Sequence, residues 1–153
     1  MNIFIFGASC SGKSTLSAAL HETLGSDWTY LDRDDLIDKE GFKEEAVDTE
    51  IERRITEKSY CIIDAQTPWR ERKEGELYFR ISPPLDVLLH RDALRTKQLK
   101  RTQIKAKWAR EFVIETHTNL AKFGDNYFDC SFDSSSKTVE EEISQISKML
   151  FDK

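Results

Sequence analysis

The sequence predicts a three-layer α/β fold, in which helices cover both faces of a five-stranded parallel sheet. Two observations lead to this prediction. Short apolar runs typical of buried strands alternate along the chain with longer amphipathic segments typical of helices. The chain has 153 residues, of which 39% are hydrophobic and 33% charged, and it contains no linker-like tract. We therefore expect residues 1–153 to form a single domain.

The amino-terminal half begins with a strand, a helix and a second strand. The apolar run Asn2–Phe6 predicts the first strand, and helix formers follow from Lys13 to Leu24, where Gly25 provides a stop. A second, short strand is predicted over Trp28–Leu31. The charged stretch Asp35–Lys58 is expected to be mostly helical, with an interruption near Gly41.

The carboxyl-terminal half continues the alternation. The further segments are strands at Ser59–Asp64, Leu77–Ser82 and Tyr127–Phe132, a helical region over Leu85–Lys122 that is broken once, and a closing helix at Thr138–Phe151. In parallel sheets, ligands bind at the carboxyl ends of the strands. Residues that follow the predicted strands should therefore converge on one cleft.

The charge is unevenly distributed. The net charge is −5, yet residues 91–110 carry eight lysines and arginines and one acid, Asp92. This pattern indicates a positive surface for phosphate or sulfate groups, and we predict a basic helical lid over about residues 91–110. A solvated helix face would explain the same pattern.

Other features bear on location. No run of eighteen apolar residues predicts a membrane span, and the first residues lead directly into a strand, so no secretory signal is expected. Cys10, Cys61 and Cys130 are odd in number and match no metal-binding spacing. They are typical of reduced thiols in a cytoplasmic protein. The sequence does not indicate an oligomeric state.

Residues 7–14 read GASCSGKS and match the phosphate-binding pattern G-x-x-x-x-G-K-[ST] between a strand and a helix. The two glycines would let backbone N–H groups point at one anion, Lys13 would reach the β- and γ-phosphates of ATP, and Ser14 would ligate Mg²⁺. The predicted ATP-binding residues are Gly7, Ala8, Ser9, Cys10, Ser11, Gly12, Lys13, Ser14 and Thr15.

Acidic residues follow two further predicted strands. Asp64 ends the run Cys61-Ile62-Ile63, and Asp32 and Asp34 lie in YLDRDDL. We predict that Asp64 and Asp32 join Ser14 in organising Mg²⁺, although many aspartates at strand ends only cap turns. Asp34 is the predicted general base, which would take the proton of an acceptor hydroxyl, and Asp32 is the alternative base. Asp35 is expected to cap the next helix, and the alternative is that Asp34 does so.

Positive charge is needed beside the transferring phosphoryl group. Candidates are Arg91, Arg95 and Arg101 in the basic segment. We predict Arg91 and Arg95 as catalytic arginines on a lid that excludes water. Arg70 and Trp69 could contact the acceptor, or they could be surface packing.

These motifs resemble those of the small P-loop kinases, a group that includes adenylyl-sulfate kinase, shikimate kinase and gluconate kinase. LDRDDL, TPWRERK and ISPPLDVLLHRD are most similar to segments of adenylyl-sulfate kinase. The resemblance implies a P-loop nucleotide kinase-like fold, an acidic pair Asp32 and Asp34 near the acceptor, Arg70 as a substrate contact, and Arg91 beside the adenine. The chain departs from that family after Asp92, where the lid motif is absent, and at Arg33, which replaces a glycine.

YLDRDDL also resembles the N-R-D-D motif of polynucleotide 5′-hydroxyl kinases, a resemblance that again implies Asp34 as the base. The leading hypothesis is a kinase that uses ATP and Mg²⁺ to phosphorylate a hydroxyl of a small molecule. One alternative is a polynucleotide kinase, which the acidic net charge disfavours. The other is a nucleotide-gated switch without transfer activity, which would need neither the acidic pair nor the basic lid.

Overall fold

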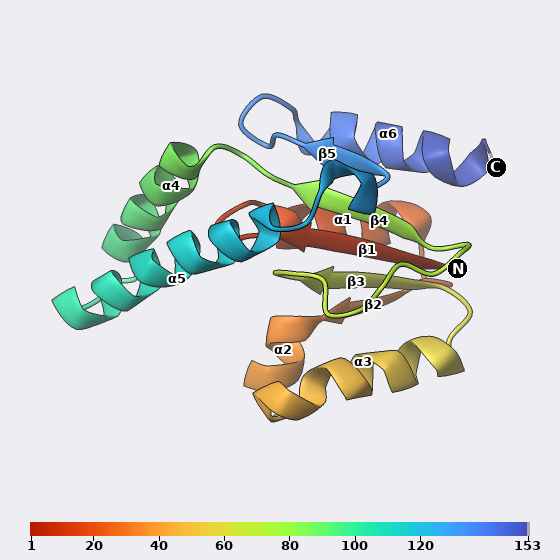
Figure 1. The fold of residues 1–153 in the computed structure, drawn as a ribbon, viewed down its shortest axis with the longest axis horizontal. Coiled ribbons are helices and arrows are strands. Elements are labelled where there is room, and N and C mark those ends of the chain that lie inside the picture. The colour runs from red at the N-terminus through yellow and green to blue at the C-terminus, as the bar shows by residue number, and fades with distance from the viewer. Residues whose placement is uncertain (153) are drawn as a thin grey trace.

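The structure is a computed structural model that describes residues 1–152. Its centre is a five-stranded parallel sheet in the order β2-β3-β1-β4-β5 (Figure 1). The strands are β1 (Asn2–Gly7), β2 (Thr29–Asp32), β3 (Cys61–Ala65), β4 (Leu77–Ile81) and β5 (Cys130–Phe132). The predicted fold class is therefore confirmed. The first strand of the chain lies in the middle of the sheet, so the loop that follows it is central.

Six α-helices surround the sheet in the described part of the chain. They are α1 (Lys13–Leu24), α2 (Arg33–Asp38), α3 (Glu44–Glu57), α4 (Leu85–Gln98), α5 (Gln103–Ala121) and α6 (Val139–Phe151). A 3₁₀ turn, η1 (Asp125–Tyr127), precedes β5.

Alternating strand residues build one core on each face of the sheet, as the two-residue period of a strand requires. On one face, Ile3 and Ile5 of β1 pack with Leu16 of α1 and Ile146 of α6. The other face carries an aromatic core, in which Phe4, Phe6 and Tyr78 pack against residues of α2, α3 and α5. Burial of a parallel strand on both faces explains why residues 3–6 of β1 are apolar without interruption.

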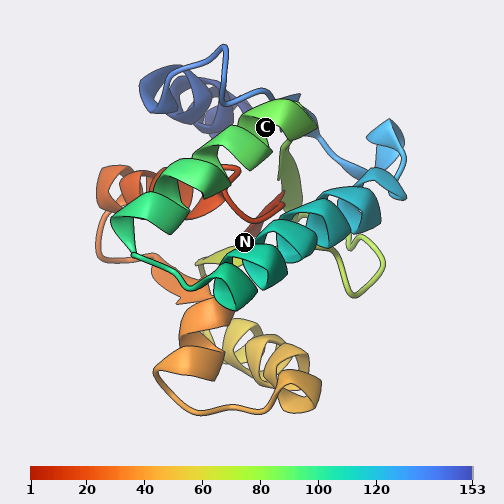
Figure 2. The ribbon, with the colours of Figure 1, turned by 90° about the vertical axis from the view of Figure 1, so that its left-hand side faces the viewer.

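The predicted helical region between β4 and β5 is broken once, as expected, and the break lies at residues 99–102. Lys100 adopts a left-handed backbone with φ of 50° there, which ends the helical path of α4. α4 and α5 lie side by side and extend beyond the carboxyl ends of the strands (Figures 1 and 2). The predicted lid, residues 91–110, comprises the end of α4, the turn and the first part of α5.

Two local predictions need correction. Asp32, not Asp35, caps α2: its carboxylate accepts the backbone N–H groups of Asp34 (2.9 Å) and Asp35 (3.3 Å). The helix therefore starts directly after β2 without an intervening loop. The last strand is also shorter than predicted, because the turn η1 occupies Asp125–Tyr127.

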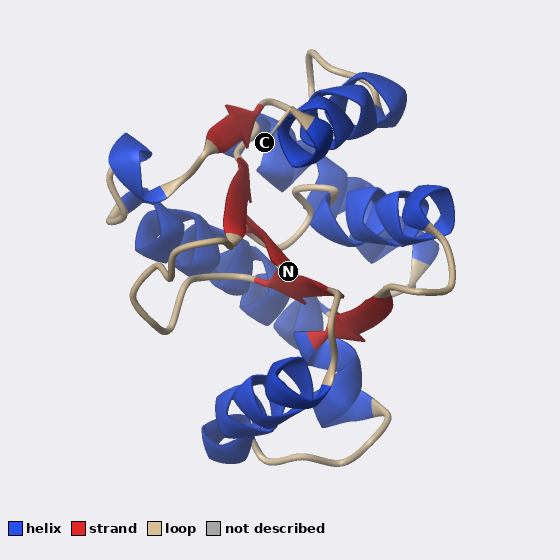
Figure 3. Cartoon of the chain, turned by 90° about the vertical axis from the view of Figure 1, so that its right-hand side faces the viewer, coloured by secondary structure: helices blue, strands red, loops and turns tan. Residues whose placement is uncertain are grey.

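The opposite end of the sheet holds the start of β1 and the end of α6 (Figure 3). The crossover loop of residues 66–76, which contains no helix, runs back to this end from the carboxyl end of β3. Among residues 1–152, no helix has the length and hydropathy that crossing a lipid bilayer would require.

Candidate active site

The loop between β1 and α1 folds tightly, and its glycines explain why. A Cβ on Gly7 would lie 2.3 Å from Ser11 Oγ and 3.2 Å from the Ile81 carbonyl oxygen, so no larger residue fits without movement. Gly12 caps α1 with a φ of 94°, a left-handed conformation that glycine adopts at little cost. Cys10 adopts a left-handed φ of 67° as well. The loop thus turns back toward the first turn of α1.

Neighbouring elements hold this loop from two sides. The Ser9 backbone N–H donates to Thr116 Oγ1 of α5 at 3.1 Å. Arg91 of α4 donates through Nη1 to the carbonyl oxygens of Cys10 (3.2 Å) and Ser11 (3.1 Å), and to Ser134 Oγ (3.0 Å). The predicted lid helices are therefore joined directly to the phosphate-binding loop.

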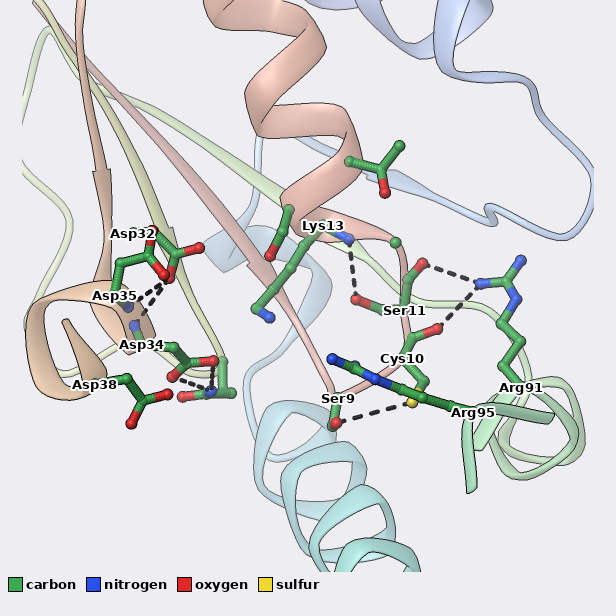
Figure 4. Close-up of a pocket in the computed structure, with 14 residues that line it drawn as sticks. Ser9, Cys10, Ser11, Lys13, Asp32, Asp34, Asp35, Asp38, Arg91 and Arg95 are labelled. Carbon is green, nitrogen blue, oxygen red and sulfur yellow. Dashed lines mark hydrogen bonds between the residues drawn. The ribbon is translucent and has the colours of Figure 1, made fainter. Parts of the chain in front are cut away.

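A cavity of about 480 Å³ opens over the loop at the carboxyl ends of the strands (Figure 4). Lys13 lies between an acidic side and a basic side of this cavity. The lining residues are Ser9, Cys10, Ser11, Gly12, Lys13, Ser14, Thr15, Asp32, Asp34, Asp35, Asp38, Gln66, Arg91 and Arg95. Most of the predicted site residues thus line one cavity. Asp64 does not line it, but its carboxylate pairs with Lys13.

Buried polar groups connect the strand ends beneath the cavity. Lys13 Nζ lies 3.6 Å from Asp64 Oδ1, and both side chains are at least nine-tenths buried. Tyr30 donates its hydroxyl proton toward Asp64 Oδ2 (3.2 Å) and Asp32 Oδ2 (3.4 Å). Burial raises the pKa of the Asp64 carboxyl, and Lys13 only partly opposes that effect. Burial and the two carboxylates also raise the pKa of Tyr30, which keeps it a hydrogen-bond donor.

The residues predicted to organise Mg²⁺ fit such an ion chemically. Asp32 and Asp64 are bridged by one hydroxyl group, and Ser14 is in the first turn of α1. All three offer oxygen ligands, which Mg²⁺ prefers. No group of three or more acidic, histidine or cysteine side chains forms a metal cluster within residues 1–152.

Asp34 has a partner that the sequence did not reveal. Gln66, directly after β3, donates through Nε2 to both carboxylate oxygens of Asp34, at 2.8 and 3.0 Å. The amide fixes the orientation of the Asp34 carboxylate toward the cavity. Gln66 is in no recognised motif; only its position directly after a strand could have suggested it.

The predicted arginines have different surroundings. Arg95 is exposed and lines the cavity, and its side chain makes no hydrogen bond or ion pair among the described residues. Arg101 pairs with Asp92 at 2.9 Å and donates to Thr96 Oγ1, which braces the turn after α4. Arg70 does not line the cavity: it is paired with Glu52 and Glu76 near the start of β4. The structure does not place Arg70 with the other predicted site residues.

A second cavity, of about 190 Å³, lies beside the first, and Gln66 lines both. Its lining residues are Arg33, Glu44, Asp48, Gln66, Thr67, Trp69, Phe112, Glu115, Thr116 and Asn119. The Asp34–Gln66 pair therefore stands where the two cavities meet.

Comparisons with known proteins give the class of fold. No family model and no curated protein sequence matches the chain. Among solved structures, shikimate kinase from Acinetobacter baumannii in complex with shikimate matches with a TM-score of 0.66 at 16% identity, over 99% of this chain and 93% of that one. Shikimate kinase from Bacteroides thetaiotaomicron matches with a TM-score of 0.64 at 21% identity, over 98% of both chains.

A gluconokinase from Sinorhizobium meliloti gives a TM-score of 0.64 at 15% identity, over 98% of this chain and 95% of that one. The chain thus has the fold of the small P-loop kinases along its full length. At these identities the likeness shows the fold alone, and the activity has to be argued from the site.

Proposed function

We propose that this protein is a kinase that transfers the γ-phosphoryl group of ATP to a hydroxyl of a small molecule, with Mg²⁺ as cofactor. One observation carries the proposal. The cavity over the phosphate-binding loop has Lys13 at its centre, Asp34 on one side and Arg91 and Arg95 on the other. Phosphoryl transfer needs a cation at the phosphates and a base at the acceptor, and the two sides of the cavity provide them separately.

The step balances with the residues present. The acceptor oxygen attacks the γ-phosphorus, the bond from that phosphorus to the β–γ bridging oxygen breaks, and ADP leaves. Asp34 takes the proton of the acceptor hydroxyl, with its carboxylate oriented by Gln66. Lys13 and Arg95 stabilise the negative charge on the transferring group and the leaving diphosphate.

Several residues would bind rather than react. Ser14, Asp32 and Asp64 would hold Mg²⁺, which supplies charge neutralisation at the phosphates when bound. Residues 7–15 would contact the phosphates through the loop backbone and the start of α1. Arg91 contacts that loop and the Ser134 segment, which supports its placement on the nucleotide side. The exposed end of α4 and the start of α5 would close over the phosphates as a lid.

Asp34→Asn tests the assignment of the base. We expect ATP binding to be retained and acceptor-stimulated ADP release to fall by roughly 10²- to 10⁴-fold, because an amide cannot take the proton. The matched control is Asp38→Asn, an exposed residue of the same helix that lines the same cavity. Equal rates for wild type and Asp34→Asn in a screen of sugars, acids, nucleosides and 5′-hydroxyl oligonucleotides would refute the assignment.

A polynucleotide 5′-hydroxyl kinase is a second candidate, and one surface favours it. Ile104, Trp108 and Phe112 recur every four residues on α5, and their side chains are 63%, 64% and 44% exposed beside the basic segment. Bases could stack on the rings of Trp108 and Phe112 while the lysines of the basic segment contact the phosphates. This candidate predicts that acceptor binding weakens steeply with salt concentration; a flat salt response would eliminate it.

A switch without transfer would leave the Asp34–Gln66 pair without a role.

Cys10, Cys61 and Cys130 are all free thiols, which supports our proposal that the protein works in the reducing cytoplasm.

A further inference from the structure

The second cavity lies where an acceptor must bind. It begins at Gln66, whose amide holds the Asp34 carboxylate, and extends between α3, α5 and the crossover loop. A molecule in this cavity can present a hydroxyl to Asp34 while the phosphates of ATP occupy the first cavity. The charge and shape of the second cavity therefore report on the acceptor.

Among residues 1–152, no cation that lines this cavity is free of an ion pair. The one basic lining residue in that range, Arg33, pairs through Nε with Asp48 at 2.8 Å and through Nη1 with Glu44 at 3.0 Å, with its side chain 14% exposed. Arg70, two positions after Pro68 in the crossover loop, is directed away into ion pairs with Glu52 and Glu76. A carboxylate, phosphate or sulfate on the acceptor would find no unpaired positive partner here.

Acidic groups, in contrast, are in excess. The lining has three carboxylates for one guanidinium. Asp48 and Glu44 each use one oxygen to bind Arg33, and their second oxygens, Oδ2 and Oε2, make no hydrogen bond within residues 1–152. The side chain of Glu115 on α5 has neither an ion pair nor a hydrogen bond in that range, although it lines the cavity.

Two aromatic rings give a second, independent indication. Trp69 and Phe112 line the cavity, and Phe112 is 44% exposed although it is large and apolar. Aromatic faces attract an ammonium group and also pack against the apolar faces of a sugar ring. The aromatic rings and the surplus carboxylates therefore both favour a ligand that carries an ammonium group.

We propose that the acceptor is a small hydroxyl compound that carries an ammonium group, such as an amino sugar or an amino alcohol. This inference rests on the proposed kinase function and adds the substrate class. The ammonium group lies among Glu115, Glu44 and Asp48 against the ring of Phe112, and the reacting hydroxyl points to Asp34. Unpaired like charge disfavours anionic acceptors.

The experiment compares acceptors that share a scaffold and differ in charge. The full chain is assayed for ADP release with MgATP and glucosamine, glucose or glucuronate, and with parallel sets built on amino alcohols, diols and hydroxy acids. Binding of each compound is measured by calorimetry in the presence of a non-hydrolysable ATP analogue. We expect the cationic member of a set to be preferred over the anionic member by at least roughly tenfold in kcat/KM.

Glu115→Lys then tests the cavity itself. Its expected effect is to shift the cation-to-anion preference toward the anion by roughly five- to tenfold. Glu111→Lys is the matched control: it is exposed, one turn earlier on α5, and lines neither cavity. We expect it to leave the preference within about twofold.

The outcomes separate the two proposals. Transfer to an anionic member in preference to its cationic counterpart overturns the substrate class and leaves the kinase function standing. An unchanged preference in Glu115→Lys overturns the assignment of the second cavity. If no compound in the full screen is bound or phosphorylated, the kinase function itself fails.

Discussion

The two ends of the sheet use the same kinds of charged residue in opposite ways. Near the start of β4, Arg70 donates to Glu52 at 2.8 and 3.0 Å and to Tyr78 Oη at 3.1 Å, pairs with Glu76, and lies 4.4 Å from the centre of the Phe4 ring. Only its Nε lacks a partner. At the carboxyl ends, Lys13 has a single carboxylate at 3.6 Å, and Arg95 has none among the described residues.

Two buried carboxyls show the energetic consequence. Burial raises the pKa of Glu76, but hydrogen bonds from Tyr78, Asn2 and Arg70 outweigh it, so the pKa lies below its ordinary value of 4.5. At Asp64, burial prevails over Lys13, and the pKa is raised. The partners of Glu76 already stabilise its negative charge. The negative charge of Asp64 would gain stabilisation from a bound cation. A predicted binding residue therefore has to be judged by the neighbouring groups that already neutralise its charge.

The largest expected effect is on stability and concerns Arg70, at the amino ends of the strands. Arg70→Met should lower the free energy of unfolding by about 3 to 5 kcal/mol, because it leaves the buried Glu76 without its cation. Urea unfolding measures the change, and Arg53→Met, whose ion pairs are on the exposed face of α3, should change it by less than about 1 kcal/mol. A stable Arg70→Met protein with weakened acceptor binding would instead restore the substrate role that the sequence suggested.

At the carboxyl ends of the strands, where Lys13 lies, the expected effect is on catalysis. Lys13→Ala should reduce phosphoryl transfer by roughly 10²- to 10³-fold, because the transferring group loses its central cation. Stability should change little by comparison with Arg70→Met. Single-turnover transfer and urea unfolding of the same preparation test both expectations; a large loss of stability with normal transfer would reverse the comparison.

Glu76→Gln should lower the free energy of unfolding at pH 7 by about 1 to 3 kcal/mol. Because the folded-state pKa of Glu76 is depressed, the stability that its charge contributes is present above about pH 4.5 and is lost as the pH falls through the folded-state pKa. The difference between wild type and variant should therefore shrink on acidification. A difference that stays constant down to the lowest pH at which both proteins fold would contradict the ionic assignment.

The smallest expected effect concerns Gln66. Gln66→Leu should lower kcat by roughly ten- to a hundredfold with little change in KM for ATP, because Asp34 loses its orientation but the phosphate loop is intact. Thr67→Val, the neighbouring residue that lines only the second cavity, is the control. A rise in KM for ATP with kcat unchanged would show that Gln66 does not position the base.

Much of the architecture was predictable because it follows from local pattern. The alternation of strand and helix segments, the loop of residues 7–14 and the acids directly after two strands were all visible in the sequence. In a parallel sheet these positions converge on one edge, so Lys13, Asp34 and Asp32 were predicted to meet before any contact was known. Asp35 shows the limit of local pattern: two adjacent acids could each cap α2, and the cap is Asp32, two residues before Asp34 and three before Asp35.

The partners of the site residues depend on segments distant in the chain. Gln66 binds Asp34 across 32 positions, and Arg91 contacts Ser134 across 43. The motif predicts Arg70 as a substrate contact, yet Glu52 of α3 and Glu76, directly before β4, neutralise it. By itself the sequence determined the α/β class and the position of the tight loop at residues 7–14, because both depend on spacing along the chain. Only the tertiary structure decided which charges remain unpaired, because pairing depends on residues that folding alone brings together.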